Sequence, residues 1–216
     1  MSVHFDRERH HRRSIRLEGY DYTQPGRYVV TLCVHGRECL FGEIVDAEIH
    51  LNDRGDMVRS AWHDLPGRCP GLSLDAFVIM PNHVHVIIIL PSRRGESRIR
   101  PGPLRVTNVA PQKYERRAYT DPKQGDHKDR PYGTAAGSLG RFIQAFKSIT
   151  TGAYIIGVRE RGWPPFAGRL WQRNYYEHII RNEDDLTRAR TYIAANPARW
   201  AEDEENPVAT RDPAVP

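Results

Sequence analysis

The sequence predicts an α+β domain of the ferredoxin-like (βαββαβ) type: an antiparallel sheet, helices on one face, and an additional C-terminal helix that carries Tyr192. Two kinds of hydrophobic periodicity carry this prediction, because β-branched runs mark strands and apolar residues at helical spacing mark helices. Their order along the chain supplies the topology. The segments, in order, are strand 27–35, helix 53–65, strands 73–80 and 83–90, helix 138–156, strand 170–180 and the C-terminal helix 183–195.

Local signals justify the boundaries in the first half of the chain. The segment 41–52 alternates loosely and predicts an accessory hairpin between the first strand and the first helix. Pro66-Gly67 and Pro70-Gly71 punctuate the chain after that helix. Pro81-Asn82 stands between two strand-like runs and predicts a tight turn, so 73–80 and 83–90 form a hairpin.

The C-terminal helix has clear start and stop signals. Asn182 is a typical N-cap residue, and Asp184 and Asp185 suit the positive end of a helix dipole. Pro197 ends the helix, because the residue before a proline is disfavoured in helical conformation.

Composition excludes several classes of protein. The 216 residues are 39% hydrophobic and 27% charged, without an apolar run near the roughly 18 residues of a membrane span. Residues 1–20 lack the apolar segment of a secretory signal. The three cysteines form no CxxC pair, so reduced thiols in a cytoplasmic protein are expected. The net charge of +5, mostly from arginine, favours a nucleic-acid partner and a nucleoid-associated location; the alternative is an ordinary basic surface.

Charge and turn residues divide the chain into three parts. Residues 1–19 form a basic N-terminal arm, 20–200 the main domain, and 201–216 an acidic, proline-containing tail. The segment 92–131 holds eleven Lys/Arg against five Asp/Glu and predicts a basic loop inserted in the domain. The arm and the insert either contact DNA or are simply solvated. We also hypothesise that the acidic tail competes with DNA for a basic groove.

Two histidines, His83 and His85, interrupt an apolar run. Residues i and i+2 of a strand point to the same face, so both imidazoles point the same way. Burying both without partners is costly, and a metal ion on that face would explain them. The alternative is a pair of structural histidines with ordinary hydrogen bonds.

Tyr192 and Asn196 are four residues apart on the C-terminal helix, which places them one turn apart on one face. A phenol and an amide facing the two imidazoles would form a site for phosphodiester transfer. His83, His85 and the Asn196 carbonyl would hold a divalent cation, and Tyr192 would attack phosphorus. The alternatives are a tyrosine of an amphipathic helix and an asparagine that caps it.

Six stretches together resemble the REP-associated tyrosine transposases, members of the single-tyrosine HUH transposase superfamily. They include the motif Met-Pro-Asn-His-Val-His at 80–85 and Tyr-Ile-Ala-Ala-Asn-Pro at 192–197. The resemblance covers about residues 12 to 200 except the insert. The matching stretches are 12–22, 39–43, 78–85, 144–148, 170–181 and 192–197.

The resemblance implies a ferredoxin-like nuclease core at 20–200 that acts on single-stranded DNA with Mg²⁺ or Mn²⁺. His83 and His85 match the metal-binding pair of the family, Tyr192 its nucleophile, and Asn196 takes the place of the third ligand. In such enzymes the tyrosine joins the 5′ phosphate of the cleaved strand and leaves a free 3′ hydroxyl, which permits strand transfer and DNA transposition. The substrate is typically a hairpin of a repetitive extragenic palindrome (REP element).

Further residues in these stretches are candidates for supporting roles. Tyr176 and His178 share one face of the predicted strand, and His178 could orient the nucleophile or the phosphate or belong to a structural network. The candidate DNA contacts are Arg12, Arg13, Arg16, Lys147 and Arg173.

Two rival functions stay open at this point. One is a module that binds hairpin nucleic acid without cutting, and the other is a hydrolytic metal phosphodiesterase in which water attacks. The oligomeric state, monomer or dimer, is also open.

Overall fold

The structure, a computed structural model, describes residues 17, 19–91 and 137–209. A four-stranded sheet forms its centre, in the order β4-β5-β1-β6. Every neighbouring pair of strands is antiparallel. This is the strand order of the ferredoxin-like fold, so the predicted fold class is confirmed. The strands are β1 (Gly26–Cys33), β4 (Ser73–Ile79), β5 (His83–Leu90) and β6 (Tyr176–Ile180).

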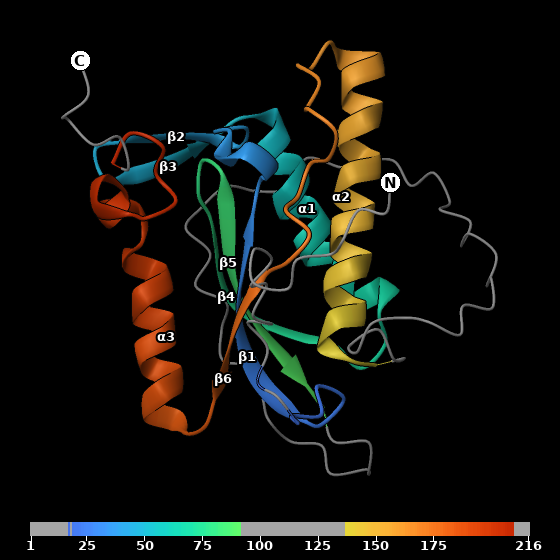
Figure 1. Cartoon of the computed structure of the whole chain (residues 1–216), viewed down its shortest axis with the longest axis vertical. Helices are drawn as coiled ribbons and strands as arrows, with labels where there is room; N and C mark the ends of the chain where they lie inside the picture. The colour runs from blue at the N-terminus through green and yellow to red at the C-terminus, as the bar shows by residue number, and fades with distance from the viewer. Residues whose placement is uncertain (1–16, 18, 92–136, 210–216) are drawn as a thin grey trace, which may run out of the picture.

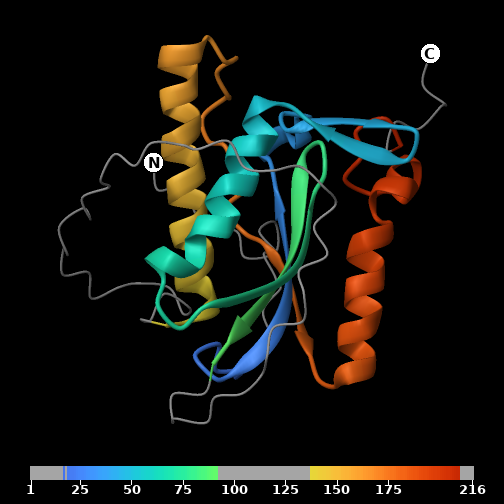
Figure 2. The ribbon, with the colours of Figure 1, turned by 180° about the vertical axis from the view of Figure 1, so that it is seen from behind.

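Helices cover both faces of the sheet. Helices α1 (Asp53–Arg68) and α2 (Leu139–Arg161) lie together on one face, and α3 (Glu183–Ala195) lies alone on the other (Figure 1). The view from behind shows the same separation (Figure 2). The additional C-terminal helix of the prediction is therefore α3.

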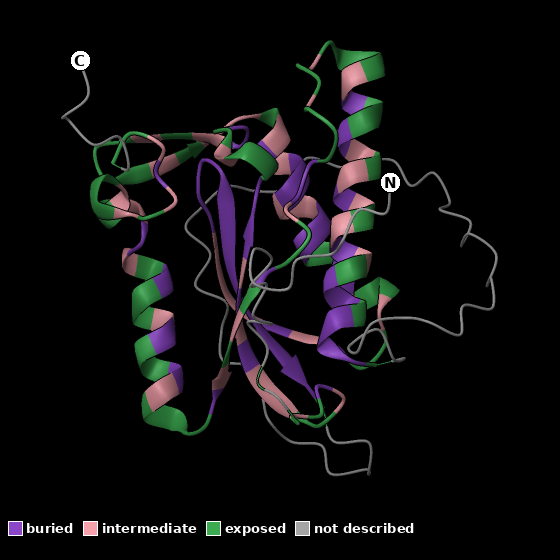
Figure 3. Ribbon diagram, viewed as in Figure 1, coloured by how far each residue is buried: buried purple, intermediate pink, exposed green. Residues whose placement is uncertain are grey.

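The alternation of side chains along the strands gives each face its own core. On β5, Val84, Val86 and Ile88 join the large core under α1 and α2, whereas Ile87 packs in the smaller core under α3. The strand is buried along its whole length, as its colour shows in Figure 3. His83 and His85 have the same parity as Ile87, so they lie on the α3 face.

Smaller elements join at one end of the sheet. The predicted accessory hairpin is present as β2 (Gly42–Val45) and β3 (Glu48–Leu51). Two 3₁₀ helices complete the set: η1 (His35–Arg37) follows β1, and η2 (Pro197–Glu202) follows α3.

Two helices are longer than predicted. α1 continues through Pro66 to Arg68, because a proline in the last turn costs only one backbone hydrogen bond, and the Cys69 N–H still donates to the Leu65 carbonyl at 2.9 Å. α2 runs to Arg161 and ends where Gly162 adopts a left-handed conformation with φ 69°.

The last strand of the sheet is shorter than predicted. β6 begins at Tyr176, and Trp171 forms only an isolated bridge with Val34. Lys147 explains the difference, since its ammonium donates to the carbonyls of residues 172, 173 and 174 at 2.7, 3.2 and 3.0 Å. These carbonyls are bound by a side chain of α2 instead of by a neighbouring strand.

Most of the predicted basic arm and the basic insert at 92–131 lie outside the described residues. Among the helices that the structure describes, none is long and apolar enough to cross a membrane.

Candidate functional site

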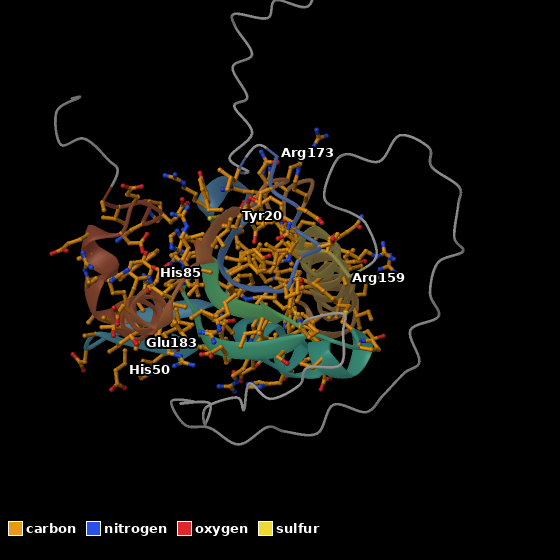
Figure 4. All side chains as sticks on the ribbon, turned by 90° about the horizontal axis from the view of Figure 1, so that it is seen from below. Tyr20, His50, His85, Arg159, Arg173 and Glu183 are labelled. Atoms are coloured by element: carbon orange, nitrogen blue, oxygen red, sulfur yellow. The ribbon has the colours of Figure 1, made fainter. Side chains whose placement is uncertain are left out.

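His83 and His85 open β5, at the end of the sheet where the Pro81-Asn82 turn enters it. Both are buried, with exposed fractions of 0% and 5%. Their Nε2 atoms face each other at 3.0 Å. Figure 4 shows His85 between the sheet and α3. The predicted pair therefore lies on one face and converges on one point.

The Asn82 side chain fixes the tautomer of His83. Asn82 Nδ2 donates to the backbone carbonyls of Arg37 and Glu205 at 3.0 and 2.7 Å, which leaves Oδ1 facing the histidine. An amide oxygen only accepts, so His83 Nδ1–H donates to it at 2.9 Å. The Nε2 atom of neutral His83 then carries a lone pair directed into the site.

His85 has a matching partner on the neighbouring strand. Its Nδ1 lies 2.8 Å from the Thr31 hydroxyl on β1, directly across the ladder. A hydroxyl can donate or accept, so the Nε2 atom of His85 either donates to His83 or presents a second lone pair. The second arrangement is the one that metal-bound histidines use, with the outer nitrogen donating to a polar group.

Burial keeps both imidazoles neutral. It lowers the pKa of His83 to about 4, although the Asn196 carboxamide opposes this shift. It lowers the pKa of His85 to about 3, where the neighbouring His83 adds to the shift and the charge of Asp203 opposes it. Neutral imidazole is the form that coordinates a metal, so the pair needs no deprotonation at neutral pH.

Tyr192 and Asn196 approach the histidines from α3. The rings of Tyr192 and His85 meet edge to face, with centroids 5.2 Å apart. Tyr192 is 45% exposed, so its phenol is open to a substrate, whereas Asn196 is only 3% exposed. The carboxamide of Asn196 lies beside both His83 and Tyr192. The structure thus brings the four predicted residues together.

The phenol of Tyr192 has no ready path to ionisation from the protein alone. Burial raises its pKa, and the negative charge of Asp203 adds to the rise. The Asn196 carboxamide and the Arg199 guanidinium act in the opposite direction but do not reverse the shift. A further positive charge in the site would lower this pKa.

A cap defines the start of α3, and an ion pair and an apolar face hold the helix against its own sheet. Asn182 Oδ1 accepts from the Asp185 N–H at 2.8 Å, as expected for the N-cap. Arg190 on α3 makes a two-pronged ion pair with Asp75 on β4, at 2.9 and 2.5 Å. The apolar face of the helix fills the smaller core with Leu186, Ala189 and Ile193. Tyr192 therefore meets the histidines of the same chain.

Asp203 completes a cluster that the sequence did not reveal. Its Oδ2 atom lies 3.8 Å from His83 Nε2. One ligand atom from each of His83, His85 and Asp203 can be chosen so that all lie within 4.8 Å of one another. We predicted only an acidic tail here, because an aspartate after a helix has no spacing that relates it to a distant strand.

An open pocket of about 450 Å³ is lined by His85 and Asp203 of this cluster. Its lining is acidic, with four carboxylates against two guanidiniums, so a phosphate entering it meets net negative charge. The predicted acidic tail thus begins beside the site instead of beside a basic groove. The lining residues are Thr31, Arg37, His85, Tyr176, Tyr192, Asn196, Arg199, Glu202, Asp203, Glu204 and Glu205.

The remaining predicted residues are placed differently. Tyr176, 52% exposed, lines the pocket. His178 is exposed, lies outside the pocket lining and pairs with Asp185 in the first turn of α3 at 3.0 Å. The Lys147 ammonium donates hydrogen bonds to three backbone carbonyls, and binding to a phosphate would require breaking these hydrogen bonds. Arg173 is exposed (Figure 4).

The candidate DNA contacts Arg12, Arg13 and Arg16 lie outside the described residues.

The donor set fits a divalent cation. Two adjacent nitrogen ligands at about 2.1 Å from one metal are about 3 Å apart, which matches the separation of the two Nε2 atoms. Asn196 Oδ1 is buried and has no hydrogen-bond donor within bonding geometry among the described residues. Buried acceptors are normally bonded, so this oxygen is available to coordinate a cation. The His-His-Asp group could hold a metal ion.

Comparison with known proteins gives a strong match in sequence and weaker similarities in structure. No family model matches the chain. Two proteins of known structure are similar to it: a REP-associated tyrosine transposase bound to a REP hairpin (18% identity, TM-score 0.48, 85% of this chain and 73% of the other) and a protein described as a putative transposase of Deinococcus radiodurans R1 (14%, 0.40, 83% and 95%).

The match in sequence is much closer. An uncharacterized protein of Haemophilus influenzae is 36% identical over 208 residues, which cover 94% of this chain and 98% of the other. The chain therefore belongs to the same protein family as this Haemophilus influenzae protein.

Proposed function

We propose that the protein is a metal-dependent, single-strand-specific DNA endonuclease and strand transferase, a transposase-like enzyme whose nucleophile is Tyr192. One observation carries the proposal: Tyr192 of α3 meets His85 of β5 in one pocket, with their ring centroids 5.2 Å apart, and His83 Nε2 lies 3.0 Å from His85 Nε2. A sequence resemblance alone does not require two segments so far apart in the chain to meet.

Tyr192 carries out the covalent step. Its phenol oxygen forms a bond to phosphorus, the bond from phosphorus to the 3′ oxygen breaks, and the 5′ phosphate stays on the tyrosine. The phenol loses one proton and the departing 3′ oxygen gains one, so the step is balanced without a net proton. Strand transfer is the reverse reaction with a different 3′ hydroxyl, because the phosphotyrosine keeps the energy of the broken bond.

The residues that would hold the cation are His83, His85 and Asn196. A divalent cation, Mg²⁺ or Mn²⁺, supplies positive charge that draws electron density from a phosphate oxygen and lowers the pKa of a nearby phenol. The positive charge would offset the acidic lining of the pocket and would lower the raised pKa of the Tyr192 phenol. The lining is acidic, and Tyr192 lies where burial and Asp203 hold the pKa of its phenol up.

The substrate class follows from the sequence resemblance: hairpin-forming repeat DNA with a short single-stranded segment. Tyr176 supports it, since an exposed aromatic ring beside the nucleophile offers a surface on which an unpaired base can stack. Because both halves of the site come from one chain, a monomer and a dimer are equally compatible with the proposal.

The test is covalent capture. Labelled single-stranded hairpin DNA is incubated with the protein and Mn²⁺ and then run on a denaturing gel. The proposal expects a protein–DNA adduct that chelator and Tyr192→Phe abolish, whereas Tyr176→Phe retains it. Cleavage that survives Tyr192→Phe would identify a hydrolytic phosphodiesterase, and binding without an adduct across many hairpins would identify a binding module.

A further inference from the structure

The ligand set His83, His85 and Asn196 has no negative charge. Two neutral imidazoles and a carboxamide would have to hold a divalent cation without a counter-charge. Mg²⁺ and Mn²⁺ are hard cations that prefer oxygen ligands, carboxylates above all. A charged oxygen ligand is therefore the missing component of the site.

Asp203 has the geometry of that ligand. Its side chain is only 11% exposed, and Oδ2 lies 3.8 Å from His83 Nε2. Its other oxygen, Oδ1, accepts from the Glu205 N–H at 2.7 Å in a local turn, which directs Oδ2 toward the histidines. The ligand atoms of His83, His85 and Asp203 lie within 4.8 Å of one another. Opposite ligands of an octahedral cation are about 4.2 Å apart, so a small inward shift of these atoms would let all three bind one cation.

The segment that carries Asp203 is fixed in place from several sides. Glu205 accepts from Asn82 Nδ2 through its carbonyl at 2.7 Å, and its carboxylate pairs with the Arg37 guanidinium at 3.0 Å. Arg37 also donates to the Glu204 carbonyl at 3.1 Å. Asn82 therefore orients His83 and anchors the Asp203 segment at the same time.

A second, independent observation points to a ligand at this spot. Asn196 Oδ1 is buried, lines the same pocket, and makes no hydrogen bond to the rest of the described chain. A buried acceptor left alone is costly unless another group occupies the space in front of it. The acidic segment, residues 202–205, thus lines a pocket that also contains a buried acceptor without a hydrogen bond to the described residues.

We propose that Asp203 is the anionic ligand of the divalent cation held by His83 and His85, with Asn196 beside it. The inference rests on the proposed function for the existence of the cation and adds a residue beyond the tyrosine helix. It also gives the start of the acidic tail a defined role, which is to supply the charged ligand of the cation.

Titration calorimetry with Mn²⁺ on the full chain at pH 7.5 tests this assignment. Asp203→Asn keeps the shape of the side chain and an oxygen that can accept from the Glu205 N–H, but it removes the charge. We expect it to weaken Mn²⁺ binding about tenfold or more. Glu204→Gln is the matched control, since it removes a carboxylate from the same segment and pocket; we expect a change of less than about twofold.

Three results would overturn the assignment: Asp203→Asn binding as tightly as wild type, Glu204→Gln weakening binding as much as Asp203→Asn, or wild type binding no Mn²⁺ at millimolar concentration. Thermal unfolding without metal checks folding, and Mn²⁺ should raise the Tm of Asp203→Asn less than that of wild type.

The two proposals fail separately. If the adduct on Tyr192 forms while Asp203→Asn binds Mn²⁺ normally, only the ligand assignment is wrong. If Mn²⁺ binding depends on Asp203 but no adduct forms, the metal site stands and the proposed function is wrong.

Discussion

His83 Nε2 and His85 Nε2 face each other at 3.0 Å, on the side of the sheet that α3 covers. Without a cation, one of these nitrogens must donate a hydrogen bond to the other. His83 carries its proton on Nδ1, where it donates to Asn82, so His85 Nε2–H is the donor. With a cation, both present lone pairs to it and the Thr31 hydroxyl accepts from His85. The same pair of residues thus serves the metal-free and the metal-bound protein with only a change of tautomer at His85.

The buried pair predicts that the metal-free protein loses stability in mild acid. The pKa values in the folded state, about 4 for His83 and about 3 for His85, lie below the unfolded value of about 6.5, so the unfolded chain binds more protons between these values. The contribution of the neutral pair to the free energy of unfolding is therefore fully present above about pH 6.5. It decreases as the pH falls toward 4. Two such groups give a slope of up to about 2.7 kcal/mol per pH unit.

Urea unfolding between pH 7.5 and 4.5 measures this slope. The double variant His83→Gln/His85→Gln, which cannot titrate at these positions, should lose most of it. Equal slopes for the variant and the wild type would show that the pair is not held neutral by burial.

Asn82 is predicted to set the tautomer of His83. Asn82→Ala removes the acceptor of His83 Nδ1–H and the donor to two backbone carbonyls, so we expect destabilisation of about 1–3 kcal/mol and a loss of Mn²⁺ affinity of about 10- to 100-fold. Nitrogen NMR of the imidazoles reports the tautomer directly. A His83 that stays protonated on Nδ1 in Asn82→Ala would contradict the assignment.

The ion pair of Asp75 with Arg190 is predicted to stabilise the packing of α3 in a pH-dependent way. Burial alone would raise the pKa of Asp75, but the hydrogen bonds from Arg190 and from the Ala76 N–H outweigh it, and the pKa is lowered. A lowered carboxyl pKa contributes stability that is present above the unfolded value of about 3.9 and is lost as the pH falls through the folded value.

Because Arg190 is partly exposed, solvent screening limits the effect, and Asp75→Asn should cost only about 1 kcal/mol at pH 7. Denaturant unfolding at pH 7 and at pH 3 tests this, and the difference between variant and wild type should shrink at pH 3. A difference that stays constant or grows would show that packing, not charge, explains it.

The acidic segment is predicted to weaken the binding of DNA when no metal is present. Glu202 and Glu204 line the pocket with Asp203 and Glu205, and like charges repel a phosphodiester. Glu202→Gln/Glu204→Gln should bind single-stranded hairpin DNA several-fold more tightly in chelator, with a smaller gain in Mn²⁺. Fluorescence anisotropy measures both. Deletion of residues 201–216 is a harsher test of the whole tail, and unchanged affinity and cleavage after it would end the idea of competition.

Much of the fold could be predicted because its signals are local. The face shared by His83 and His85 follows from the alternation of a strand, and the start of α3 follows from Asn182 as N-cap. The strand predicted from residue 170 was wrong up to Tyr175, because its backbone carbonyls are bound by Lys147, a residue of another element. Local propensity contains no information about such a partner.

In the site, too, the residues with a local sequence signal could be predicted and those placed by distant contacts could not. Tyr192 and Asn196 were predicted from their helical spacing and from the family resemblance, and the structure brings them to the histidines. Asp203 was missed because its place in the site depends on the path of the chain after α3, which Arg37 and Asn82 fix through contacts distant in sequence. The three backbone carbonyls that the Lys147 ammonium contacts also lie at a distance in sequence that local patterns do not reveal.

The residue to which the DNA becomes attached shows whether Tyr192 is the nucleophile. After reaction with hairpin DNA and Mn²⁺, the protein is digested with nuclease and trypsin and analysed by mass spectrometry. We expect a nucleotide on the peptide 191–199, whose only tyrosine is Tyr192. A nucleotide on the peptide 174–181, which contains Tyr175 and Tyr176, or cleaved DNA without any modified peptide, would contradict it.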